Sequence, residues 1–186
     1  MQEIENSLRI LKETIKYFKK GDANNLKSLS NQTIHTASTS QDFDNVFLAV
    51  LVYSLGKILE RENYREMDGW KFFFKKTYDN LRKAHTKLKE KDLENFRQYL
   101  GEIRESINNI EGNLSFYIRD VFYKAQINKA SKIYQHGVSA QRAAELLGIT
   151  LWDLSSYIGQ GSVNEADIKD SLSFYERKKI FEDFIK

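Results

Sequence analysis

The sequence predicts an all-α protein: a helical bundle over residues 1–137, a helix-turn-helix over 138–160 and a C-terminal helix over 161–186. The chain of 186 residues contains no proline, where average usage of about 5% would supply roughly nine. Proline favours loops and breaks helix interiors, so its absence, with only nine glycines, indicates long helices and short connections. Apolar residues also recur at helical spacings of three and four.

The N-terminal part of the bundle is expected to hold two helices. The first ends at Gly21, and Asp22 can cap the second, which covers about residues 23–38. The segment 36–42 is rich in Ser and Thr and is predicted to be a turn. The apolar stripe of the first helix consists of Ile4, Leu8, Leu11, Ile15 and Phe18, and the buried candidates of the second are Leu26, Leu29, Ile34 and Ala37.

The third predicted helix is capped by Asp42 or Asp44 and runs to about Glu62. It is apolar on nearly all sides, which is typical of a helix at the centre of a bundle. Its β-branched residues would also suit a buried strand, but its length favours a helix. The apolar set is Phe43, Val46, Phe47, Leu48, Val50, Leu51, Val52, Leu55, Ile58 and Leu59.

Three more helices complete the predicted bundle. A turn at Asp68 and Gly69 precedes the first of them, and Asp92 caps the second. Gly112 and the residue after it separate the second from a long aromatic helix over 114–136, which Gly137 ends.

Residues 139–159, SAQRAAELLGITLWDLSSYIG, are predicted to form the helix-turn-helix. Ala144 is small enough for the two helices to touch there, Gly148 supplies a left-handed turn residue and Ile149 fills the core behind the turn. The second helix of such a motif usually enters the major groove of DNA. The residues expected to bury the inner faces are Leu147, Leu154 and either Tyr157 or Ile158.

The exposed face of that second helix carries no Lys or Arg. Its expected members are Leu151, Trp152, Asp153, Ser155 and Ser156. Adjacent exposed apolar side chains usually mark a protein interface, so Leu151 and Trp152 are predicted to contact a protein partner. Two alternatives stay open for Trp152: stacking on a nucleic acid, or packing against the C-terminal helix.

Positive charge is concentrated in one stretch of the bundle. The chain carries a net charge of +3, but residues 71–91 hold eight basic residues against two acidic ones. Either this is a solvated helix surface, or it is a stripe that binds phosphates without regard to sequence. The predicted basic surface consists of Lys71, Lys75, Lys76, Arg82, Lys83 and Lys87.

The residues predict neither catalysis nor a bound cofactor. There is no cysteine, and none of His35, His85 and His136 has a second His at metal-ligand spacing. No set of catalytic side chains can be seen to converge, so the protein is expected not to be an enzyme and to bind no metal. The acidic N-terminus and an apolar run of only eight residues, 46–53, predict a cytoplasmic protein without a membrane segment.

About twenty residues of the helix-turn-helix resemble small archaeal and cyanobacterial antitoxin-like proteins. The resemblance implies a DNA-associated regulator or an antitoxin that binds a partner. The residues that carry it are Ser139, Arg142, Ala143, Ala144, Glu145, Leu146, Gly148, Ile149, Thr150, Trp152 and Asp153.

The preceding helices resemble the HEPN group of helical bundles, many of which are RNases or partners of nucleotidyltransferases. The catalytic signature of that group is an Arg followed by a His, with about four to six residues between them. No Arg precedes a His at that spacing here, since Arg82 is too close to His85. A bundle of this kind would therefore be inactive as a nuclease.

Two functions follow from these features. The first is a nucleic-acid-associated regulatory or antitoxin-like protein, in which the basic surface adds phosphate contacts. The second is a protein-interaction module, in which Leu151 and Trp152 dock on a partner and the helix-turn-helix does not touch DNA. In the first function the DNA-contacting residues are Gln141, Arg142, Thr150, Trp152, Ser155 and Ser156.

Overall fold

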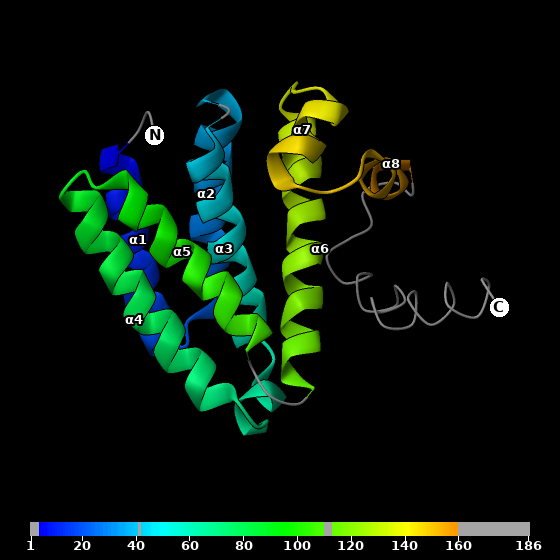
Figure 1. Cartoon of the computed structure of the whole chain (residues 1–186). Coiled ribbons are helices and arrows are strands. Elements are labelled where there is room, and N and C mark those ends of the chain that lie inside the picture. Colours follow the sequence, from blue (N-terminus) through cyan, green and yellow to red (C-terminus); the bar gives the residue numbers. More distant parts are fainter. Residues whose placement is uncertain (1–3, 41, 110–112, 160–186) are drawn as a thin grey trace.

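The computed structural model describes residues 4–40, 42–109 and 113–159, apart from the side chains of residues 34–40, 107 and 108. These residues confirm the all-α fold, since no strand occurs among them. Helices α1, α4 and α5 lie on one side, α2 and α3 in the middle, and α6 to α8 on the other side (Figure 1). The elements are α1 (Ile4–Lys20), α2 (Ala23–Ser40), α3 (Phe43–Leu59), the 3-10 helix η1 (Glu62–Glu66), α4 (Trp70–Lys89), α5 (Leu93–Asn108), α6 (Leu114–Gln135), α7 (Ala140–Leu147) and α8 (Leu151–Gly159).

Helix α3 is buried on both sides. Leu51 and Leu55 belong to a main cluster of buried side chains that also includes residues of α1, α2, α4, α5 and α6. Ala49 and Tyr53 belong to a second cluster, which is shared with α6, α7 and α8. A helix between two cores needs apolar residues around its whole circumference, which accounts for the composition of α3 and confirms its predicted central place.

The main cluster is rich in stacked aromatic rings. Phe18 of α1 and Phe74 of α4 stack with their centroids 4.7 Å apart. Trp70, in the first turn of α4, makes tilted contacts with Phe73 and Phe74. Such ring pairs add about 0.5–1.5 kcal/mol each beyond the area that they bury. The Phe18–Phe74 pair joins the end of α1 to the first turns of α4.

Helices α2 and α3 approach each other unusually closely at Gly56. A Cβ atom built on Gly56 would lie 3.1 Å from the carbonyl oxygen of Ala23 and 3.3 Å from the Cβ of Leu26. The Ser30 hydroxyl donates to the carbonyl oxygen of Ala49 at 2.7 Å. The absent side chain of Gly56 therefore lets the two backbones come into contact.

The predicted aspartate caps are present in the structure. Asp22 and Asp92 each accept a hydrogen bond from the backbone N–H three residues later, at 3.1 and 3.2 Å. Of the two candidates for α3, Asp42 is the cap, and it accepts from the Asp44 N–H at 2.9 Å. Asp44 is instead buried and receives three hydrogen bonds from the Arg97 guanidinium, which fastens α5 to the start of α3.

The predicted turn over residues 36–42 is wrong, because α2 continues to Ser40 and α3 begins at Phe43. Ser and Thr disfavour helices by only a few tenths of a kcal/mol each, roughly, and α2 packs along α3. A Ser- and Thr-rich composition therefore does not by itself end a helix. The third helix also ends at Leu59, before the predicted Glu62, and η1 follows it. The predicted C-terminal helix, 161–186, lies outside the described residues.

Candidate functional site

The turn between α7 and α8 has the predicted left-handed glycine. Gly148 has φ 62° and ψ 34°. Its N–H donates to the Glu145 carbonyl at 3.2 Å, and the Ile149 N–H donates to the Ala144 carbonyl at 3.1 Å. This pair of bonds is the Schellman motif, which ends a helix and redirects the chain. At the other end of α7 the Ser139 hydroxyl accepts from the Arg142 N–H.

The second cluster attaches this motif to the bundle. Ala144, Leu147 and Leu154 are buried in it, as predicted, and Ile149 and Ile158 pack against it. Gln126 of α6 donates from Nε2 to the Leu147 carbonyl at 2.8 Å, which satisfies one of the last carbonyls of α7. Asn128 of α6 donates to the Tyr157 hydroxyl of α8 at 3.3 Å. The outer face of α8 is thus held in a defined orientation.

Leu151 and Trp152 lie together in the first turn of α8 and are both exposed. The exposed fraction of the side chain is 47% for Leu151 and 79% for Trp152. The value for Trp152 is the highest among the exposed large hydrophobic residues that the structure describes. The other candidate contact of Trp152, the segment around Tyr175 and Phe181, lies outside the described residues. Leu151 and Trp152 form what we call the α8 apolar pair.

The predicted DNA-contacting residues are at the surface, but several are engaged within the motif. Gln141 and Arg142 both donate to the Glu145 carboxylate, at 3.2 and 3.5 Å. The Thr150 hydroxyl accepts from the Asp153 N–H at 3.0 Å and donates to the Asp153 carboxylate, so it caps α8. Ser155 is exposed and Ser156 half-buried. The structure therefore brings the six predicted residues to one motif. Helix α8 itself, with the sequence LWDLSSYIG, contains no Lys or Arg.

The predicted basic surface lies on α4, on the side of the molecule opposite α7 and α8 (Figure 1). Five of its six members are exposed: Lys71, Lys75, Lys76, Arg82 and Lys83. Lys87 is half-buried and forms ion pairs with Glu90 at 2.8 Å and Asp92 at 3.6 Å. One straight duplex on α8 would therefore not reach this surface.

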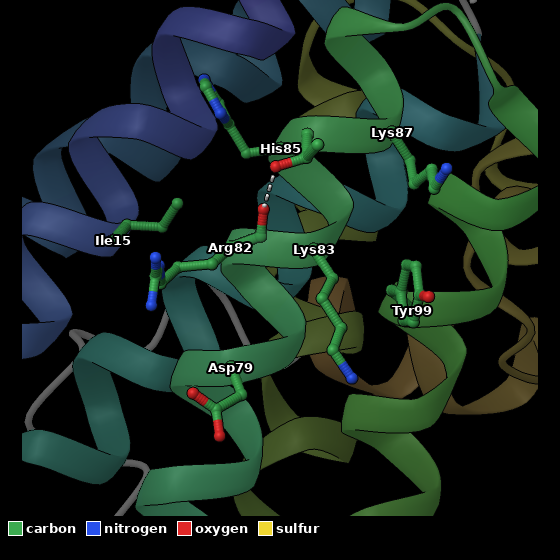
Figure 2. A pocket seen from close by; sticks show the side chains of 8 residues that line it. Ile15, Asp79, Arg82, Lys83, His85, Lys87 and Tyr99 are labelled. Atoms are coloured by element: carbon green, nitrogen blue, oxygen red, sulfur yellow. Dashed lines mark hydrogen bonds between the residues drawn. The ribbon is translucent and has the colours of Figure 1, made fainter.

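A shallow hollow of about 600 Å³ runs along the outer side of α4 between α1 and α5 (Figure 2). Arg82 and His85 lie on the α1 side of α4, as does Ile15, whereas Lys83 and Lys87 lie on the α5 side, as does Tyr99. Burial of the ring, and then the positive charges of Lys89 and Lys12, lower the pKa of His85. Three cations, Arg82, Lys83 and Lys87, line the hollow with one carboxylate, Asp79, so positive charge predominates there.

Helix α1 adds cations to this region that sequence reasoning missed. Lys12 and Lys19 are both exposed, and Lys19 lies with its Nζ 6.0 Å from the centroid of the Tyr78 ring of α4. Their spacing of seven residues, on either side of Ile15, was a signal that the two share a helix face. What the sequence does not reveal is that α1 and α4 are neighbours.

Lys129 of α6 is a second residue that sequence reasoning missed. It is fully buried. Its Nζ lies 4.0 Å from the centroid of the Tyr53 ring and donates to the Asn31 amide oxygen at 2.9 Å. Its position halfway between the buried Ala125 and Ile133, at spacings of four, placed it on the apolar side of the helix. Lys129 ties α6 to α2 and α3.

Other kinds of site receive no support within the part of the chain that the structure describes. No three His, Cys, Asp or Glu side chains gather there in a way that could hold a metal ion. None of the helices there has the length and apolar character that a membrane crossing requires.

Comparison of the chain with protein-family models, with curated proteins and with solved structures finds no match.

Proposed function

We propose that the protein works by binding other macromolecules and not by catalysis, and that its helix-turn-helix, α7 to α8, binds protein. The observation that carries this proposal is the exposure of the α8 apolar pair. Tryptophan is among the residues that contribute most binding energy at protein interfaces. Because α6 and α7 hold the helix α8 in place, its backbone needs little further ordering when a partner docks.

The electrostatics of α8 favour a protein partner over DNA. DNA binding relies on Lys and Arg side chains that neutralise phosphates, and α8 has neither. The one cation of α7, Arg142, is shared with the Glu145 carboxylate. Asp153, the one acidic residue of α8, would face the phosphates with the wrong sign of charge.

A second copy of this chain is the partner that this surface fits. In a twofold dimer the same patch meets itself, so a strongly charged patch would repel its own copy. The exposed side chains of α8 are apolar or uncharged, and the carboxylate of Asp153 is hydrogen-bonded to Thr150. Charge repulsion between the α8 faces of two copies is therefore limited to one pair of Asp153 carboxylates.

Sedimentation velocity over a range of protein concentrations tests this proposal. Trp152→Ala should weaken self-association at least tenfold, since loss of an interface anchor costs about 2 kcal/mol or more. Phe72→Ala, at an exposed aromatic of α4, is the matched control and should leave association unchanged. Loss of thermal stability in Trp152→Ala without loss of assembly would mean that the indole is internal packing. A wild-type chain that stays monomeric at all concentrations would contradict the proposal that a second copy of the chain is the partner.

A regulator that binds DNA through α8 is the second candidate. The Schellman turn and the Ser139 cap give α7 and α8 the connection of a helix-turn-helix, and this observation favours it. Gel-shift titrations with duplex DNA and with Arg142→Gln test it. Few phosphates can be neutralised near α8, so this binding would be weak and its salt dependence shallow. Tight, sequence-specific binding that survives Arg142→Gln would contradict this account of the charges.

A further inference from the structure

Two rows of cations lie side by side on the outer surface of α1 and α4. Helix α1 contributes Lys12 and Lys19, and α4 contributes Lys71, Lys75, Arg82 and Lys89; we call these six residues the α1–α4 basic face. All six are exposed. None of them forms an ion pair within the part of the chain that the structure describes.

The two rows run antiparallel, and side-chain contacts fix their register. The Lys19 ammonium and the Arg82 guanidinium lie 6.0 and 5.9 Å from the centroid of the same ring, Tyr78. Farther along, Lys12 of α1 and Lys89 of α4 both act on His85, whose pKa they help to lower. The α4 row extends over about 27 Å, from Lys71 to Lys89, at a rise of about 1.5 Å per residue.

One aromatic ring lies within this face, and a second lies beside it on α5. Tyr78 is half-buried between Lys19 and Arg82, and Tyr99 of α5 is half-buried with the Lys83 ammonium 5.3 Å from its centroid. Figure 2 shows Lys83 and Tyr99 on the α5 side of α4, and Arg82 on the α1 side. Cations beside π faces are the elements with which proteins hold single strands without sequence preference: cations neutralise the backbone, and rings or guanidinium planes stack with bases.

We propose that the α1–α4 basic face binds the phosphodiester backbone of a single-stranded nucleic acid. This binding site is separate from the helix-turn-helix and does not depend on the function proposed for α8. The six cations bind phosphates, and Tyr78, with the Arg82 guanidinium beside it, offers a surface for an unpaired base.

The shape of the face favours a single strand over a duplex. A helix that reads duplex DNA must project far enough to enter the major groove. Helix α4 instead packs against both α1 and α5, so it cannot enter a groove as a lone helix. A flexible single strand can follow the furrows on either side of α4.

The same surface is poorly suited to a membrane. Helices that lie in a lipid interface insert a row of large apolar side chains beside their cations. Of the exposed large hydrophobic residues that the structure describes, Phe72 is the one that lies on α1 or α4. One such side chain does not make an apolar row.

Fluorescence anisotropy with a labelled oligothymidylate of about 20 nucleotides tests the proposal, because single-strand sites cover roughly 4–16 nucleotides. The test variant combines Lys19→Gln, Arg82→Gln and Lys89→Gln. Affinity should fall at least tenfold. The slope of log K against log salt should become shallower by about 2, since each phosphate contact on a single strand contributes about 0.7.

The matched control removes the same charge elsewhere, with Arg65→Gln, Arg104→Gln and Arg119→Gln, three exposed residues of η1, α5 and α6. It should retain most of the affinity. Equal losses in the two triple variants would overturn the proposal, because binding would then follow net charge and not this face. Tighter binding of a duplex of the same sequence, or of vesicles of phosphatidylserine, would also overturn it. Trp152→Ala should bind the oligonucleotide like the wild type, so failure of this site is distinguishable from failure of the α8 interface.

Discussion

Some buried polar side chains of the bundle have a hydrogen-bond partner, and others have none among the described residues. Thr14 of α1 is buried and its hydroxyl donates to the Ile10 carbonyl at 2.7 Å. Thr77 of α4 is equally buried, but its hydroxyl finds no partner among the described residues, and neither amide atom of Asn80 does. A buried polar atom without a partner costs about 1–3 kcal/mol of stability. The two threonines therefore make different contributions to the folded state.

Thr77→Val should stabilise the protein. Valine keeps the β-branched shape and removes the hydroxyl that is buried without a partner, so the free energy of unfolding should rise by about 1 kcal/mol. Urea denaturation measures this change. The same substitution at Thr14 removes a hydrogen bond that is made, and should lower stability by roughly 0.5–1.5 kcal/mol. If both variants moved in the same direction, hydrogen bonding would not be the cause.

His85 should make stability depend on pH. Burial and the charges of Lys89 and Lys12 lower the pKa of its ring below the ordinary value of about 6.5. The folded state thus favours the neutral ring, and as pH falls through about 6.5 the unfolded chain takes up the proton first. Stability is therefore lost toward lower pH. Between pH 7 and 5, the melting temperature of His85→Gln should fall less than that of the wild type. Lys89→Gln should also weaken the pH dependence of the melting temperature, but by less. If the melting temperatures of His85→Gln and the wild type changed equally with pH, His85 would be excluded as the source of the pH dependence.

At the residue scale, the sequence predicted the positions that follow from helical periodicity. Leu147 and Leu154 are buried and Trp152 is exposed, as the pattern indicates. The sequence could not predict which polar groups pair with each other. That Lys129 reaches Asn31 of α2 depends on a contact that forms only when the helices are in place. The Thr150 cap of α8, by contrast, joins residues three apart, and this spacing was a local signal in the sequence.

At the scale of elements, capping residues predicted helix boundaries well and composition predicted them poorly. Asp22, Asp92 and Gly148 stand where the expected helices begin or end. The prediction for the Ser- and Thr-rich end of α2 was wrong, since that composition is typical of a turn and α2 continues as a helix to Ser40. The neighbours of α1 were likewise beyond the sequence, because an amphipathic stripe does not identify the helix that it packs against.

The contact between α2 and α3 predicts opposite effects of one substitution at two helical glycines. Gly56→Ala should destabilise the protein by roughly 1–3 kcal/mol, because the new methyl group would press on the Ala23 carbonyl and Leu26. Gly101→Ala in α5 meets nothing within 4 Å and should add up to about 1 kcal/mol through helix propensity. Thermal denaturation of the two variants is the measurement. A more stable Gly56→Ala protein would show that the two helices separate easily.

At the scale of the whole molecule, α3 connects the two buried clusters. Leu48 and Leu51 belong to the main cluster, and Ala49 and Val50, which lie between them in sequence, belong to the second. Neither cluster can lose α3 without exposing apolar surface in the other. The sequence predicted the central place of this helix, but not that α7 and α8 would share a core with it.

This arrangement predicts a single unfolding transition for the described part of the chain. Leu100→Ala in the main cluster and Leu154→Ala in the second should each cost about 2–5 kcal/mol. Both should shift one common midpoint when followed by circular dichroism and by calorimetry. If Leu154→Ala produced a separate early transition and left the main one in place, α7 and α8 would unfold independently of the bundle.

The two tryptophans occupy opposite environments, which gives the protein a built-in pair of optical probes. Trp70 is buried in the main cluster, and Trp152 is the most exposed of the large hydrophobic side chains that the structure describes. A collisional quencher such as acrylamide should reach the indole of Trp152 and spare that of Trp70. Emission from Trp152 then reports on occupancy of α8, and emission from Trp70 on the integrity of the bundle, in one sample and without an attached dye.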